Sequence, residues 1–157
     1  MKVLKISLIT IIALMMSCTG FSNSFFKMLF GENDIKVECL YSNAPMWEDG
    51  ATFEIYKINH YLQNGKDFPK RVILTDQTFH RYHAFSWRPT LESEELVFQR
   101  FFDENKNDKR FQSIDFYLLI RLPNTYYVIL TDSLNRERLF IYDDKTQLLY
   151  YFSLYEV

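Results

Sequence analysis

The sequence predicts an α+β protein: a mostly antiparallel sheet that ends in a four-stranded C-terminal meander, with one main helix packed on it. Three observations predict this class. The last third of the chain alternates strand-like apolar runs with short polar turns, and a segment near residue 100 has the periodicity of an amphipathic helix. The chain also contains 15 Phe, 11 Tyr and 2 Trp, an aromatic content that favours sheet.

The length of 157 residues suits one domain with a sizeable hydrophobic core and is short for two domains that each bury their own core. We predict a signal peptide over residues 1–17, an apolar tether over residues 18–34 and a single domain over residues 35–157.

The chain opens with a short basic and then apolar segment. Lys2 and Lys5 precede an apolar run over residues 6–16, and Ser17 then precedes Cys18. The run is too short to span a bilayer, which needs about 20 apolar residues, but it has the length of a secretory signal core. This segment resembles the signal of a bacterial lipoprotein. The resemblance implies cleavage before Cys18 and a membrane anchor of diacylglycerol and palmitate-type acyl chains, with diacylglycerol on the Cys18 sulfur.

An ordinary secretory signal is the alternative. Cleavage after a small residue such as Ser22 or Ser24 would discard Cys18 and release the protein. The second cysteine, Cys39, lies in an alternating strand-like run. It is a buried thiol if Cys18 carries lipid, whereas an unlipidated Cys18 could form a disulfide with it.

The first half of the chain predicts several short elements. Phe21, Phe25 and Leu29 recur at helical spacing, so residues 21–30 either dock on the domain or lie in the membrane interface. Residues 35–41 and 52–58 read as strands, followed by a helical turn at 59–62 and a short strand at 71–75.

The second half predicts the main helix and the meander. The helix runs from Leu91 to about Glu104, with Thr90 as N-cap and acidic residues in its first turn. Strand-like runs follow at residues 114–122, 126–131, 138–142 and 148–155. The turns between them are short, so neighbouring strands are antiparallel. In the first run, Phe116, Leu118, Ile120 and Leu122 share one face.

The segment over residues 79–88 is the candidate partner-binding surface. It combines aromatic, histidine and arginine side chains, which are common at interface hot spots. We single out Tyr82, His83, Trp87 and Arg88 as its binding residues. The alternative is that its large aromatic side chains, Trp87 among them, belong to the core.

Catalytic, metal and cofactor chemistry have little support. The histidines, including His80 and His83, lack neighbouring acidic or cysteine ligands, and Arg81 would repel a cation. The chain contains neither a serine-hydrolase nor a zinc-protease motif, and its four glycines leave no phosphate loop. Once Lys2 and Lys5 are removed with the signal, 16 basic and 20 acidic residues remain, so no nucleic-acid partner is predicted.

The sequence therefore predicts a small membrane-anchored lipoprotein of the cell envelope, on the periplasmic side or at the cell surface. We expect a non-enzymatic binding module for a macromolecular partner, a protein or a carbohydrate. Immunity proteins that neutralise imported toxins offer an analogy of size, charge and location. The alternatives are a small envelope hydrolase or carbohydrate-acting enzyme that uses acidic residues, and an envelope structural or assembly protein.

Overall fold

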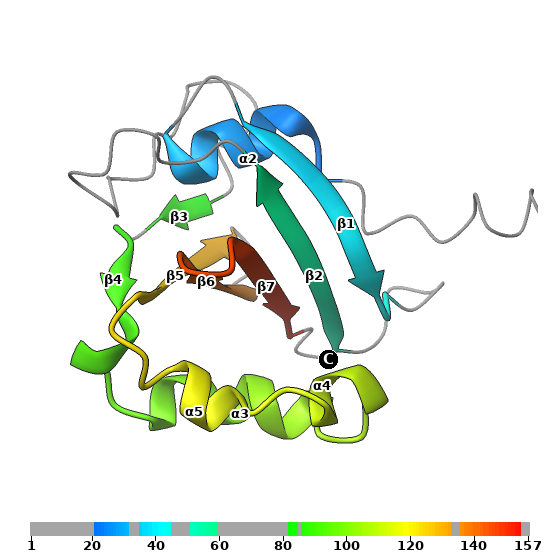
Figure 1. The fold of residues 1–157 in the computed structure, drawn as a ribbon, viewed down its shortest axis with the longest axis vertical. Coiled ribbons are helices and arrows are strands. Elements are labelled where there is room, and N and C mark those ends of the chain that lie inside the picture. The colour runs from blue at the N-terminus through cyan, green and yellow to red at the C-terminus, as the bar shows by residue number, and fades with distance from the viewer. Residues whose placement is uncertain are drawn as a thin grey trace, which may run out of the picture.

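A computed structural model describes residues 21–31, 35–44, 51–59, 82–84, 86–132 and 136–154, with only the backbone described at 82–84 and 132. These residues form one antiparallel sheet with helices on both sides (Figure 1). The sheet order is β1-β2-β7-β6-β5-β3, and β4 also pairs with β5. The strands are β1 (Lys36–Ser42), β2 (Thr52–Asn59), β3 (Tyr82–Ala84), β4 (Arg88–Pro89), β5 (Thr125–Asp132), β6 (Glu137–Asp143) and β7 (Leu148–Ser153).

The α+β class is confirmed. The strands expected at 35–41 and 52–58 correspond to β1 and β2, which pair with each other. Strand β2 also pairs with β7. The expected turn at 59–62, apart from Asn59 in β2, and the expected strand at 71–75 lie outside the described residues. Within the part of the chain that the structure describes, no helix is long and apolar enough to cross a membrane.

The C-terminal meander has three strands, β5, β6 and β7, because the first of the four expected runs is helical. Residues 109–119 form the short helices α4 (Lys109–Gln112) and α5 (Phe116–Leu119). Asp108 accepts hydrogen bonds from the backbone N–H groups of Arg110 and Phe111, and Asp115 accepts one from that of Leu118. Each aspartate thus satisfies the open N-terminus of a helical turn, which favours helix over strand.

The main helix, α3 (Leu96–Asn105), begins later than expected. Residues 90–92 form a separate 3₁₀ turn, η1 (Thr90–Glu92). Thr90 is buried and its hydroxyl donates to the carbonyl of Thr125 on β5 instead of capping a helix. The helix was thus predicted correctly over residues 96–104 and wrongly over 91–95.

Both faces of the sheet are covered, whereas one helical layer was expected. Alternate side chains of β5, β6 and β7 point to opposite faces. Phe140, Tyr142 and Tyr151 pack on one face beneath α2 (Asn23–Phe30), and Leu139, Ile141 and Phe152 pack on the other against α3, α4 and α5. This two-sided burial explains why these strands are almost continuously apolar.

Helix α2 belongs to the domain and not to a tether. Phe25, Phe26, Met28, Leu29 and Phe30 are all buried. The Ser22 hydroxyl caps the helix by accepting a hydrogen bond from the Phe25 N–H, and Gly31 ends it at φ 67°. The prediction that residues 21–30 dock on the domain is confirmed, so the expected tether over 18–34 is wrong for residues 21–31.

Candidate functional site

The segment singled out from the sequence lies along the outer edge of β5. Strand β3 pairs Tyr82 with Asp132 and His83 with Thr131, and β4 pairs Arg88 with Tyr127. The backbone of Tyr82 and His83 is described, whereas their side chains are not. The structure therefore brings Tyr82, His83 and Arg88 to one sheet edge.

Trp87 is a core residue and not a surface residue. Its side chain is 4% exposed, and its indole N–H donates to the carbonyl oxygen of Leu29 in α2 at 2.7 Å. The Trp87 ring also lies 5.4 Å from the ring of Phe30. Because a partner cannot reach this ring in the folded protein, Trp87 is removed from the predicted binding surface. Its sequence alternative, a place in the core, is correct.

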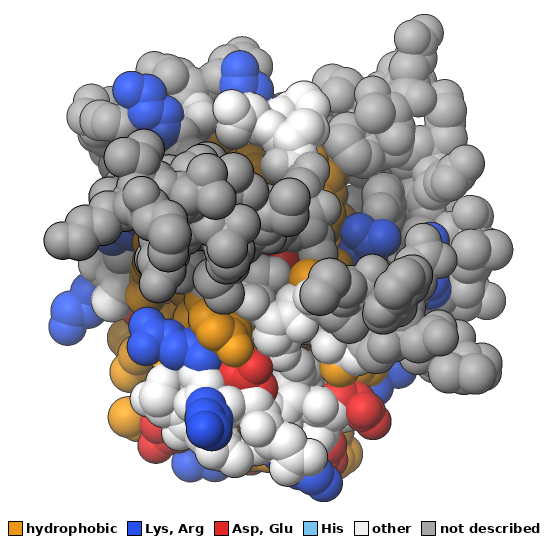
Figure 2. All heavy atoms as spheres, turned by 90° about the vertical axis from the view of Figure 1, so that its right-hand side faces the viewer, with side chains coloured by type: hydrophobic (Ala, Val, Ile, Leu, Met, Phe, Trp, Pro, Cys, Tyr) orange, Lys and Arg blue, Asp and Glu red, His pale blue; other side chains and the backbone are white. Residues whose placement is uncertain are grey.

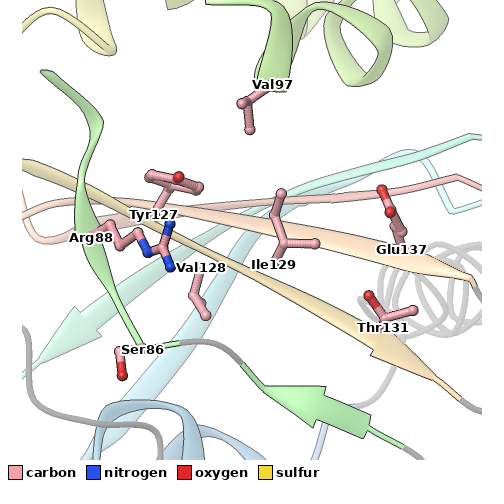
Figure 3. Close-up of a pocket in the computed structure, with 8 residues that line it drawn as sticks. All are labelled: Ser86, Arg88, Val97, Tyr127, Val128, Ile129, Thr131 and Glu137. Atoms are coloured by element: carbon pink, nitrogen blue, oxygen red, sulfur yellow. The ribbon is translucent and has the colours of Figure 1, made fainter. Parts of the chain in front are cut away.

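Arg88, in contrast, is exposed and lines a half-open cavity of about 270 Å³ between α3 and the outer strands, which we call the Arg88 cavity. Val97 points into it from α3, Arg88 enters from β4, and Glu137 stands at the opposite end (Figure 3). The lining is apolar in the middle and polar at both ends. It consists of Ser86, Arg88, Val97, Tyr127, Val128, Ile129, Thr131 and Glu137.

Of the two charged side chains that line the Arg88 cavity, only Glu137 has an ion-pair partner among the described residues. Glu137 forms an ion pair with Arg100 of α3. For Arg88, no ion pair with any other described residue is present. The Tyr127 hydroxyl accepts a hydrogen bond from the Ser93 hydroxyl at 2.6 Å, which links the cavity wall to the turn between η1 and α3. The cavity thus combines one uncompensated cation with a neutralised carboxylate.

A second feature is an exposed apolar area on the helical layer. Of the six large hydrophobic side chains that are exposed among the described residues, five lie in η1, α3, α5 and the turn after α5. We call these five the leucine surface. Leu96 is 70% exposed and Leu118 is 58% exposed. The members are Leu91, Leu96, Tyr117, Leu118 and Leu122.

A small cleft and an ion pair lie beside the leucine surface. Leu91, Glu95 and Arg121 line a cavity of about 250 Å³, and the Arg121 guanidinium lies 3.3 Å from the Glu95 carboxylate. Leu118 lies in α5, and Leu122 lies in the turn that follows it, where its N–H donates to the Leu119 carbonyl. Further exposed carboxylates, at Glu92 and Glu94, make the rim acidic.

The leucine surface was missed in the sequence. Leu118 and Leu122 were expected in the buried face of a strand, and Leu91 in the apolar face of the main helix. The signal that could have located them is the pair of helix-capping aspartates, Asp108 and Asp115, because a short helix exposes positions that a strand pattern would bury.

Asp108 also joins the helical layer to the sheet. Its carboxylate accepts hydrogen bonds from the Tyr41 hydroxyl at 2.6 Å and from the Asn43 amide at 3.0 Å. Burial alone would raise the pKa of Asp108, but the hydrogen bonds from Tyr41, the backbone and Asn43 together hold it below its ordinary value. Burial, followed by the hydrogen bond to Asp108, raises the pKa of Tyr41 to about 12.

Among the residues that the structure describes, further acidic side chains lie in a turn or line separate cavities. The Asp143 carboxylate closes the β6–β7 turn by accepting from the Lys145 N–H and the Thr146 hydroxyl. Burial and then the Asp143 charge raise the pKa of Asp144, and the same two causes raise that of Tyr150 to about 12. The Arg88 cavity and the smaller cleft each hold a single carboxylate, Glu137 or Glu95.

Buried Glu54 is engaged by its neighbours. The Ser42 hydroxyl donates to one carboxylate oxygen at 2.6 Å, and the Tyr56 hydroxyl donates to the other.

No group of three His, Cys, Asp or Glu side chains with metal-site geometry occurs within the described ranges. On the side where α4 lies, acidic and basic side chains are interspersed over the helical layer (Figure 2).

The chemical state of Cys39 bears on that of Cys18, because a disulfide and a lipid thioether exclude each other at one sulfur. Cys18, the predicted lipid attachment site, lies outside the described residues. Cys39 lies on β1 with an exposed side chain and takes part in a disulfide, so the expectation of a buried thiol is wrong. Cys18 and Cys39 are the only cysteines of the sequence. A sulfur that carries a lipid thioether cannot also belong to a disulfide.

Comparisons with protein-family models, with characterised proteins and with solved structures find no match to this chain.

Proposed function

We propose that this protein is an exported, non-enzymatic binding module of the cell envelope, which exists either anchored to a membrane through lipid on Cys18 or lipid-free with Cys18 in the disulfide of Cys39. It recognises a protein partner, in the manner of an immunity or adaptor protein. The observation that carries the proposal is the leucine surface, which holds, in one helical layer, five of the six large hydrophobic side chains exposed in the described part of the chain.

The composition of the leucine surface supports a protein partner. Contiguous exposed apolar side chains bordered by charge are typical of protein interaction sites. Leu96 and Leu118 supply apolar area, and an exposed ion pair joins Glu95, next to Leu96 in the sequence, to Arg121, just after α5. The additional carboxylates of Glu92 and Glu94 favour a partner with an apolar centre and a basic rim.

The position of Phe21 supports an arrangement in which a lipid anchor and the leucine surface lie on different sides of the sheet. Phe21, at the start of the described chain, packs on the α2 side of the sheet, with its ring 4.9 Å from that of Tyr151. Cys18 is three residues before Phe21, a reach of roughly 11 Å. A lipid on Cys18 would therefore hold the α2 side near the membrane. The α3–α5 layer lies on the opposite side of the sheet (Figure 1) and would face away from the bilayer.

The disulfide at Cys39 favours a second form, in which the protein is exported without lipid. Disulfides persist in oxidising compartments, so both forms agree with export. The intact mass of the mature protein separates them. Lipidation predicts a chain that starts at Cys18 and carries the added lipid mass, which Cys18→Ala abolishes together with membrane attachment. A lipid-free chain that gains two hydrogen atoms on reduction would instead assign Cys18 to a disulfide.

The partner is tested by affinity capture from solubilised envelope. We expect the wild-type chain to retain one defined protein, and Leu96→Asp/Leu118→Asp to retain at least about tenfold less, because both charges would be buried in the interface. The matched control is Asn107→Asp/Gln112→Asp, which adds the same charges at exposed positions outside the leucine surface. Equal retention by all three chains, or none by any of them, would contradict the proposal.

A further inference from the structure

The Arg88 cavity is a built site and not a gap between side chains. Trp87 and Thr90 are both buried, and they fix the short strand that carries Arg88 and Pro89. Arg88 is paired with Tyr127 of β5, so the Arg88 and Tyr127 side chains lie next to each other on the same face of the sheet. An exposed arginine is thus held between two anchored residues, with its guanidinium on the same side of the cavity as Tyr127 and Val128 (Figure 3).

The charges in the cavity select an anion. The guanidinium of Arg88 has no carboxylate partner among the residues that the structure describes, whereas Glu137 is neutralised by Arg100. An arginine presents a planar fork of donors that matches a carboxylate with two parallel hydrogen bonds. A ligand carboxylate would supply the counter-charge that none of the described residues gives to Arg88.

The uncharged lining residues indicate which non-ionic part of a ligand would fit the cavity. Val97, Ile129 and the Tyr127 ring form an apolar middle, and the Thr131 hydroxyl lies toward the end where Glu137 stands. The volume of about 270 Å³ equals roughly nine waters at about 30 Å³ each, which corresponds to a ligand of roughly ten non-hydrogen atoms. Arg88 is the only cationic side chain among the described lining residues, which favours a ligand with one negative charge.

The geometry points to a binding site for a small monocarboxylate with an apolar or aromatic body, held through its carboxylate by Arg88. This site uses residues different from those of the leucine surface, so it does not depend on the proposed protein partner.

The test is an NMR titration of the full mature chain carrying Cys18→Ala, so that no lipid competes for the probe. Phenylacetate has the required size and charge, and we expect saturable shifts of cavity amides such as Ile129 and Thr131 at millimolar concentration or below. Phenylacetamide, its neutral counterpart, and phenethylammonium, its cationic one, should bind at least about tenfold more weakly, because each loses the charge-assisted pair.

Variants assign the effect to Arg88. Arg88→Gln should weaken phenylacetate binding by about tenfold or more, Arg88→Lys should fall between the two, and the matched exposed-arginine control Arg110→Gln should bind like wild type. The amide spectrum of each variant reports whether it is folded. Equal binding of phenylacetate and phenylacetamide, equal loss in Arg110→Gln, or no saturable shift would overturn the assignment. Tighter binding of phenyl phosphate would overturn the choice of a carboxylate.

Discussion

Trp87 shows how one side chain can join two layers of the molecule. Its indole N–H donates to the Leu29 carbonyl near the end of α2, and its ring packs beside Phe30 and Tyr142. This contact crosses 58 positions of sequence. The residue types of the segment over 82–88 could be read in advance, but the burial of Trp87 depends on where α2 docks, which no local pattern encodes.

We expect Trp87→Phe to lower the free energy of unfolding by about 1–3 kcal/mol, because it leaves the buried carbonyl of Leu29 without its donor. Urea denaturation followed by circular dichroism gives this value. The control is Tyr117→Phe, an exposed ring on α5 whose change should stay within about 0.5 kcal/mol. Equal effects of the two substitutions would contradict the structural role of the indole.

The burial of Tyr41, together with its hydrogen bond to Asp108, predicts an alkaline loss of stability. The pKa of Tyr41 is raised from 10.0 to about 12 in the folded protein. Above pH 10 the unfolded chain loses the phenolic proton while the folded protein keeps it, so this contribution to stability is complete below pH 10 and disappears as the pH rises through 12.

The measurement is the unfolding free energy of wild type and Tyr41→Phe across this pH range. Wild type should be the more stable chain at neutral pH and should lose stability more steeply above pH 10. The raised pKa of Tyr150 is common to both chains and cancels in the comparison. Parallel curves for the two proteins would show that the Tyr41 hydroxyl is not coupled to folding.

Among the elements, strands with short turns were the easiest to predict. The runs that became β5, β6 and β7 carry their own turn signals, such as the Asp143 turn. Residues 114–122 were harder, because Phe116, Leu118, Ile120 and Leu122 alternate like a strand. Two helix caps override that alternation, and the capping group of Asp115 lies just before the pattern begins.

Helix α2 is the element whose loss should cost most. Leu29 is fully buried between α2 and the sheet. We expect Leu29→Ala to lower the free energy of unfolding by about 2–5 kcal/mol, through lost burial and the cavity that it leaves. Leu118→Ala, at an exposed position of the leucine surface, should change it by no more than about 0.5 kcal/mol. If denaturant unfolding gives the two variants the same stability, α2 is not part of the cooperative core.

For the whole molecule, the sequence indicated the class but not the number of layers. An apolar segment next to a predicted lipidation signal suits either a membrane-facing tether or a docked helix. The aromatic content of β6 and β7 decides between them, because Phe140, Tyr142 and Tyr151 need a cover that α2 provides. The candidate site followed the same pattern. Arg88 could be proposed from composition, whereas the leucine surface became visible only from the three-dimensional arrangement.

The most direct test of the binding function is site-specific photo-crosslinking in living cells with the N-terminus intact. A photoreactive residue at Leu96 or at Leu118 should crosslink to one and the same envelope protein. The same group at exposed Lys27 on α2, or at exposed Gln112 on α4, should not crosslink to that protein. Crosslinks to it from Lys27 or Gln112 as strong as those from the two leucine positions, or no defined product from Leu96 and Leu118, would contradict a partner on the leucine surface.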